Sequence, residues 1–161
     1  MKNPIYILRI ALISLFLLPI SVRISISQQA GPAPPEFLVT TPSNYDFDDT
    51  VNILKGAIEE QNLMVVLEID AQRMLRMVDV QSGGMTQILF FHPRYMKRII
   101  AANRNAGIAP PLKVVVVETP NGKVMVRYEQ PEHLFEAYEG LSEIAAELDA
   151  VVRTIVAEVN S

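Results

Sequence analysis

The segment that most constrains the fold is 112–128, LKVVVVETPNGKVMVRY. Two runs rich in β-branched residues flank Asn121-Gly122, a pair that readily supplies the positive φ angles of a tight hairpin turn. Such a turn joins strands that run in opposite directions, whereas parallel strands need a long crossover. The segment therefore predicts a β-hairpin, and with it an antiparallel sheet.

Further strands and helices are expected around this hairpin, from the residue period, the prolines and the capping residues. A strand ends at Pro42, and Asp46 or Asn44 is expected to cap a helix that begins near Phe47 and stops at Asn62. The remaining assignments are strands at 63–69 and 86–91, a short amphipathic stretch at 70–78, and helices from Pro93, from Pro131 to Gly140 and from a capping Ser142. This order indicates the α+β class, with helices covering one face of an antiparallel sheet.

The first 27 residues have the order expected of an export signal. Lys2 and Arg9 precede an apolar run of 13 residues, 10–22, and small residues follow. Cleavage after Ser27 would release the rest of the chain. An apolar helix over residues 5–26 would instead be long enough to remain as a membrane anchor.

Both alternatives place the remainder outside the cytoplasm. We therefore expect a periplasmic or otherwise extracytoplasmic protein, either soluble after cleavage or anchored to the inner membrane by residues 5–26. Residues 28–36, QQAGPAPPE, are rich in proline and glycine and are expected to form a semi-rigid linker. One domain, residues 37–161, is expected to follow it.

Composition and motifs favour recognition over catalysis. The chain contains no cysteine, which excludes disulfides, thiolate metal sites and a cysteine nucleophile. The spacings G-x-S-x-G, H-E-x-x-H and G-x-G-x-x-G are absent as well. We therefore expect no catalytic residues, no metal and no cofactor.

A basic helix stands out in a chain whose formal net charge is −4. At 100° per residue, four cations fall within about 120° of one another: Arg94, Lys97, Arg98 and Arg104. The opposite side is apolar and is expected to be buried: Tyr95, Met96, Ile99, Ala102 and Ala106. The sequence therefore predicts one helix with a cationic face and a buried face.

Unlike charges are also separated along the chain. Residues 80–117 contain five cations and no acid, whereas residues 129–158 contain eight acids and one arginine. The cationic face would suit the acidic helices of a second copy in a homo-oligomer, a membrane protein complex, or anionic lipid headgroups. The alternative is a solvated face that only makes the helix soluble. Removal of residues 1–27 leaves 11 basic and 18 acidic residues, so nucleic acid is not expected as a partner.

Two weaker functions remain open. His92, at a strand end beside Arg94, is a candidate for a cleft that binds a small ligand or an anion. Met74 and Met77 have a spacing that a Cu(I) site could use. The other methionines that occupy apolar positions of regular elements are expected to be core filler: Met64, Met96 and Met125. The segment EQPEHLFE, 129–136, is expected to be a solvated acidic helix start rather than a metal site.

Three segments, 45–63, 88–99 and 109–131, resemble the domain of unknown function 302 family. The resemblance covers residues 37–159 and rests on four short motifs in order: His92-Pro93, Pro111-Leu112, Asn121-Gly122 and Tyr128 to Pro131. Some members of the family have cysteine where this chain has Phe91 and Leu112, and His92 replaces the usual asparagine. Thiol chemistry is therefore not expected.

The resemblance implies a compact two-layer domain with the order β-α-β(4)-α, similar to the TATA-binding-protein group and often found as a dimer. It implies no activity, because the family is defined without one, and similarity of fold does not transfer function. Our leading hypothesis is an exported, non-enzymatic interaction module. It would dock as a homodimer or as an accessory subunit at the periplasmic face of a membrane protein complex.

Overall fold

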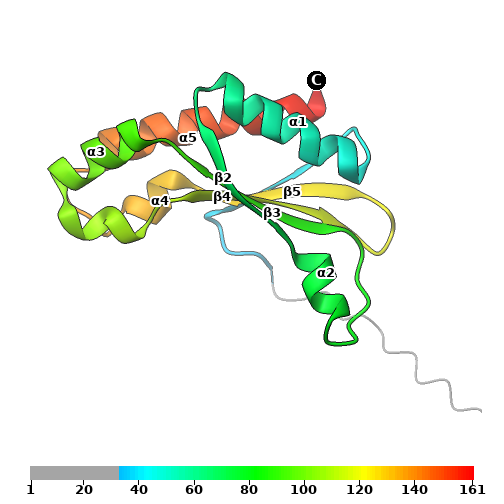
Figure 1. Cartoon of the computed structure of the whole chain (residues 1–161). Helices are drawn as coiled ribbons and strands as arrows, with labels where there is room; N and C mark the ends of the chain where they lie inside the picture. Colours follow the sequence, from blue (N-terminus) through cyan, green and yellow to red (C-terminus); the bar gives the residue numbers. More distant parts are fainter. Residues whose placement is uncertain (1–32) are drawn as a thin grey trace, which may run out of the picture. The chain divides into compact units, whose positions relative to one another are not determined.

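The computed structural model describes residues 33–161, which form a five-stranded antiparallel sheet with helices (Figure 1). The strands are β1 (Leu38–Pro42), β2 (Met64–Asp70), β3 (Met85–Phe91), β4 (Leu112–Glu118) and β5 (Val124–Glu129). Their order in the sheet is β1-β5-β4-β3-β2. The expected α+β class and antiparallel sheet are thus confirmed. The predicted signal or anchor, residues 1–27, lies outside the described residues, as does most of the linker.

Residues 33–161 also form five α-helices and two 3₁₀ helices. They are α1 (Phe47–Glu60), α2 (Ala71–Arg76), α3 (Pro93–Ala102), η1 (Arg104–Ile108), α4 (Pro131–Phe135), α5 (Ser142–Ala157) and η2 (Glu158–Asn160). Of these, α4, α5 and η2 follow the last strand. Within residues 33–161, no helix has the length and apolar character needed to cross a membrane.

The predicted hairpin joins β4 to β5 at the centre of the sheet. Glu118 pairs with Val124 at its closed end, and Gly122 has the positive φ, 76°, that this turn requires. The turn is closed by hydrogen bonds from the Thr119 amide to the Lys123 carbonyl, 2.8 Å, and from the Gly122 amide to the Thr119 carbonyl, 2.8 Å. Local turn chemistry therefore sets the register of the two strands.

One face of the sheet forms the core. Alternate side chains of the central strands are fully buried on that face, and they pack against the apolar stripes of α1 and α5. The largest of them are Ile88 and Phe90 of β3, Val114 and Val116 of β4, and Val126 of β5. Figure 1 shows α1, α3 and α5 together on this side of the sheet.

Residues 159–161 are bound to the segment that follows β1. The Asn44 amide donates to the Val159 carbonyl, 2.9 Å, and the Tyr45 hydroxyl donates to the Ser161 carbonyl, 2.7 Å. Nearby, β1 pairs with β5 rather than with a strand that is close to it in sequence. Residues 38–42 are therefore paired with residues that follow them by 83 positions or more.

The predicted helix ends are confirmed in part. Asp46 caps α1 by accepting a hydrogen bond from the Asp49 amide, 2.9 Å, and Asn62 adopts the left-handed conformation, with φ of 53°. The expected cap at Ser142 is wrong, because Ser142 is the first residue of α5 and Leu141 holds the cap position without a side-chain hydrogen bond. The helix that begins at Pro131 ends at Phe135, well before Gly140.

The expectation that helices cover only one face of the sheet is wrong for α2. Figure 1 shows α2 on the side of the sheet away from α1, and α2 has no buried residue. Helices α2 and α3 also interrupt the four consecutive strands that the β-α-β(4)-α order implies. Most of the face opposite α1, α3 and α5 is consequently left without a helical layer.

Two glycine-to-alanine substitutions are expected to change stability in opposite directions. Gly56 lies in the middle of α1, and a Cβ there would touch nothing within 4 Å. Gly56→Ala should therefore raise the free energy of unfolding by about 1 kcal/mol, because alanine loses less backbone entropy in a helix. A Cβ at Gly122 would also touch nothing within 4 Å, but Gly122 has a positive φ. Gly122→Ala should therefore lower the free energy of unfolding by about 1 kcal/mol, because alanine is strained at a positive φ. Urea unfolding of both variants checks the pair, and equal signs would contradict our account of the hairpin turn.

Candidate functional site

The basic helix α3 begins with two residues that fix its start. His92 has extended backbone angles, and its Nδ1 accepts a hydrogen bond from the Arg94 amide, 3.0 Å. Pro93 follows as the first helical residue, where its missing amide hydrogen costs nothing. Nδ1 of His92 is thus used as a helix cap, and the predicted role of His92 in a ligand cleft stays a prediction.

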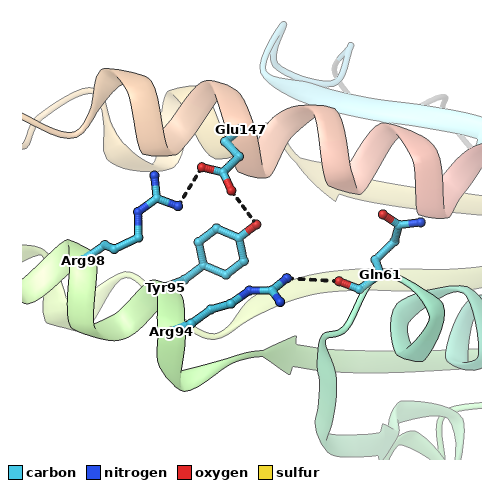
Figure 2. A network of polar contacts seen from close by, with 5 residues as sticks. All are labelled: Gln61, Arg94, Tyr95, Arg98 and Glu147. Atoms are coloured by element: carbon cyan, nitrogen blue, oxygen red, sulfur yellow. Dashed lines mark hydrogen bonds and ion pairs between the residues drawn. The ribbon is translucent and has the colours of Figure 1, made fainter.

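Tyr95 and Arg98 of α3 converge on Glu147 of α5 (Figure 2). The Tyr95 hydroxyl donates to Oε1 of Glu147, 2.9 Å, and Nη1 of Arg98 donates to Oε2 of the same carboxylate, 2.6 Å. Only 2 % of Tyr95 is exposed. One carboxylate therefore joins two helices through two charge-assisted hydrogen bonds.

Arg94 binds elsewhere in the same subunit. Its Nη2 donates to the Gln61 carbonyl, 3.2 Å, just after α1 ends (Figure 2). Its guanidinium also lies 5.0 Å from the centre of the Tyr95 ring, within the range of a cation–π contact. Arg94 and Arg98 thus hold α3 against both α1 and α5.

The network shifts the pKa of both groups that face Arg98. The hydrogen bond from Arg98 lowers the pKa of Glu147 below its ordinary value, and the Tyr95 hydroxyl adds to this effect. Burial raises the pKa of Tyr95, as does its hydrogen bond to Glu147. The carboxylate of Glu147 is therefore ionised and the phenol of Tyr95 is neutral at neutral pH.

The four predicted cations do not form one free helical face. Arg98 is already paired with an acid of its own subunit, 2.6 Å away. Arg104 lies in η1, because α3 ends at Ala102 and Asn103 adopts an extended conformation with φ of −150°. Among residues 33–161, Lys97 and Arg104 have no ion-pair partner. Two of the four cations, Arg94 and Arg98, therefore bind groups of their own subunit and hold α3 in place.

The predicted buried side of the helix is confirmed only for the residues near its centre. Tyr95 and Ile99 are buried, and Ala106 is buried within η1. Met96 is half-buried, whereas Ala102 is exposed. The helix is shorter than the sequence pattern indicates, and its apolar stripe is correspondingly narrow.

The predicted burial of the methionines does not hold for all of them. Met96 and Met125 are half-buried, but Met64 is exposed, so its assignment as core filler is wrong. The copper candidates Met74 and Met77 are exposed on α2 and just after it.

Exposed apolar side chains gather on one part of the molecule that sequence reasoning missed. Among residues 33–161, nine large hydrophobic residues are exposed, and seven of them lie between 64 and 80. We call these seven the β2–α2 surface: Met64, Val66, Leu67, Met74, Met77, Val78 and Val80. The run MVVL at the start of β2 was a usable signal, because an edge strand that is apolar on successive residues cannot bury them all.

The segment 129–136 behaves as a polar surface. His133 lies 3.1 Å from Glu136 and 3.9 Å from Glu129, and its ring stacks on Phe37 with centroids 3.9 Å apart. Within residues 33–161, no group of three or more histidine, cysteine, aspartate and glutamate side chains is arranged to hold a metal ion.

The strands and helices of residues 33–161 define a small α+β domain with a five-stranded antiparallel sheet. The family called Domain of unknown function DUF302 matches residues 39–159 of the chain. The chain therefore belongs to the DUF302 family, as the resemblance of its motifs indicated.

A solved structure supports the same assignment. The crystal structure of an uncharacterized conserved DUF302 protein from Bacillus stearothermophilus is similar, with a TM-score of 0.72 and 20% sequence identity. The match covers 78% of this chain and 99% of that one. At this identity the likeness shows the fold. No curated protein matches the chain.

Replacing Glu147 with glutamine should remove a pH-dependent part of the stability. The pKa of Glu147 is lowered by folding. Its contribution is therefore complete above the ordinary pKa of about 4.3 and is lost as pH falls through the lowered value. Wild type should be more stable than Glu147→Gln at pH 7, and this difference should shrink as the pH falls below about 4, as measured by urea unfolding.

Glu143→Gln is the matched control, because Glu143 lies on the same helix and forms no ion pair with residues 33–161. The free energy of unfolding of Glu143→Gln should differ little from that of wild type at both ends of the pH range. A Glu147→Gln difference that stays constant with pH would contradict the role assigned to Arg98.

Proposed function

We propose that the chain is an exported, non-enzymatic interaction module that docks through the free edge of β2, with a second copy of itself as the partner. The observation that carries the proposal is the β2–α2 surface: Met64, Val66 and Leu67 are exposed on β2, a strand whose outer edge has no neighbour among residues 33–161. A free strand edge presents unpaired amide and carbonyl groups, and another strand satisfies them best.

The two edges of the sheet differ in a way that favours β2. At the other edge, β1 has polar Thr40 and Thr41 and ends with Pro42, which has no amide hydrogen to donate. Met64, Val66 and Leu67 of β2, by contrast, are apolar and at least half exposed. The β1 edge is therefore protected against pairing, and the β2 edge is apolar.

The acids of β2 do not oppose such a contact. Glu68 is bound to Lys55 of α1, 2.8 Å away, and Asp70 lies 4.0 Å from Arg76. Charged side chains on an edge strand usually discourage pairing. Here both charges already have partners within the subunit, so a second strand meets no uncompensated acid of β2.

The charges that flank β2 favour a second copy in antiparallel orientation. Glu59 and Glu60 precede the strand at the end of α1, and Arg73 and Arg76 follow it in α2. In an antiparallel pair, the start of one strand lies beside the end of the other. A two-fold contact between identical strands therefore brings Glu59 and Glu60 of each copy toward Arg73 of the other, which forms no ion pair within residues 33–161.

The accessory-subunit alternative uses the same edge with a strand of another protein. In that case Lys97 and Arg104, the two unpaired cations of the α3–η1 region, are available for electrostatic contact with a membrane complex. The oligomeric state of the chain distinguishes the two partners.

Engineered single cysteines test the homodimer, since the natural chain has none. Met64→Cys, Val66→Cys and Glu68→Cys place one thiol at successive positions of the edge. A disulfide forms only where two Cα atoms lie within about 7 Å. We expect oxidation to give a covalent dimer most efficiently at the position nearest the two-fold axis, as read on a non-reducing gel.

Ile108→Cys is the matched control, because Ile108 is 81% exposed and lies on η1. It should not crosslink under the same conditions. Val66→Lys should shift the wild-type dimer toward monomer in analytical ultracentrifugation by at least tenfold in Kd, and Ile108→Lys should not. A wild-type chain that remains monomeric, or four cysteine variants that crosslink equally well, would overturn the homodimer.

A further inference from the structure

The side of the sheet away from α1, α3 and α5 contains a groove of about 290 Å³ that crosses several strands. We call it the open-face groove and define it by Leu38, Met85, Lys113, Val115, Val117 and Arg127. The pairing register places these residues on one face: Met85 pairs with Val117, and Val115 pairs with Arg127. The groove therefore runs over β3, β4 and β5 to the start of β1.

Its floor is apolar. Leu38, Met85, Val115 and Val117 are half-buried although no helix of the core layer covers them. Neighbouring strands lie about 4.8 Å apart, so four strands give a floor roughly 14 Å across. A floor of this length suits an extended aliphatic chain better than a small compact molecule.

Two cations border this floor. Lys113 and Arg127 are exposed, and neither forms an ion pair with an acid within residues 33–161. Because Val115 lies directly across from Arg127, Lys113 is its diagonal neighbour on the same face, roughly 7–8 Å away at the backbone. Both side chains are long enough to reach one anionic group between them.

The one acid that lines the groove has another contact. Glu129 lies across from Lys113, but its Oε1 is 3.9 Å from Nε2 of His133 at the end of the groove. The two cations therefore keep an excess of positive charge beside an apolar surface.

We propose that the open-face groove binds a single-chain amphiphile with an anionic head group. The aliphatic tail lies along the floor formed by Met85, Val115 and Val117, and the head group lies between Lys113 and Arg127. A carboxylate and a phosphate monoester both satisfy this chemistry. The site is separate from the β2 edge and does not depend on dimer formation.

Photocrosslinking of the full-length chain tests this site. The probe is dodecanoate with a diazirine at the end of its tail, and the chain is held in lipid nanodiscs if its N-terminal segment is retained. Mass spectrometry should find the label on peptides that contain Met85 or Val115–Val117. Labelling should fall about tenfold in the double variant Lys113→Gln/Arg127→Gln.

The control is the double variant Lys97→Gln/Arg104→Gln, which removes the same charge from the α3–η1 region and should label like wild type. Val117→Asp places a charge in the floor and should also reduce labelling about tenfold. Circular dichroism of each variant checks that the fold is retained. We expect it to be retained, because all five substituted positions are partly or fully exposed.

Competition identifies the head group. Unlabelled dodecanoate or single-chain phosphatidate should displace the probe, and the stronger competitor shows whether carboxylate or phosphate is preferred. The proposal is overturned if neutral dodecanol competes equally well, if labelling is confined to residues 1–32, or if the Lys113→Gln/Arg127→Gln variant labels like wild type. These outcomes are independent of whether β2 mediates a dimer.

Discussion

Within residues 33–161, a sheet whose helical cover lies mainly on one face is the constraint from which the rest of the structure follows. The helical layer of α1, α3 and α5 buries Ile88, Phe90, Val114, Val116 and Val126, and this burial supplies most of the apolar stabilisation of the domain. The opposite face and the β2 edge have no such cover. Both the opposite face and the β2 edge carry apolar side chains that the fold does not bury completely. Exposed patches of this kind commonly mark contact sites.

The basic helix illustrates how a charge pattern changes meaning once the fold is known. From the sequence, Arg94 and Arg98 look like a surface offered to a partner. In the structure they are occupied by Gln61 and Glu147, and they hold α3 in place over the buried ring of Tyr95. Arg98 and Glu147 are 49 positions apart, so no local pattern reveals their contact. The separation of acidic and basic segments along the chain is explained in part by this pairing.

Features that depend on neighbouring residues were predictable from the sequence. The Asn121-Gly122 turn, the Asp46 cap and the left-handed Asn62 are all confirmed, because each is decided by a few adjacent groups. The placement of Arg104 on the same helical face is wrong. A helical wheel assumes a continuous helix, whereas the helix is interrupted at Asn103. The run MVVL signals that β2 has apolar residues in succession, but its place at the sheet edge depends on the pairing of distant strands, so the segment alone does not show which of them are exposed.

The fastening of the last residues to the loop after β1 bears on when this chain can fold. Strand β1 pairs only with β5, and Asn44 is held by Val159, so the native arrangement cannot close before almost the whole polypeptide is present. Contacts of such long sequence separation slow folding. A growing chain of this kind therefore lacks its complete sheet until residues 124–129 have been made, and lacks the Asn44–Val159 contact until residue 159 has followed.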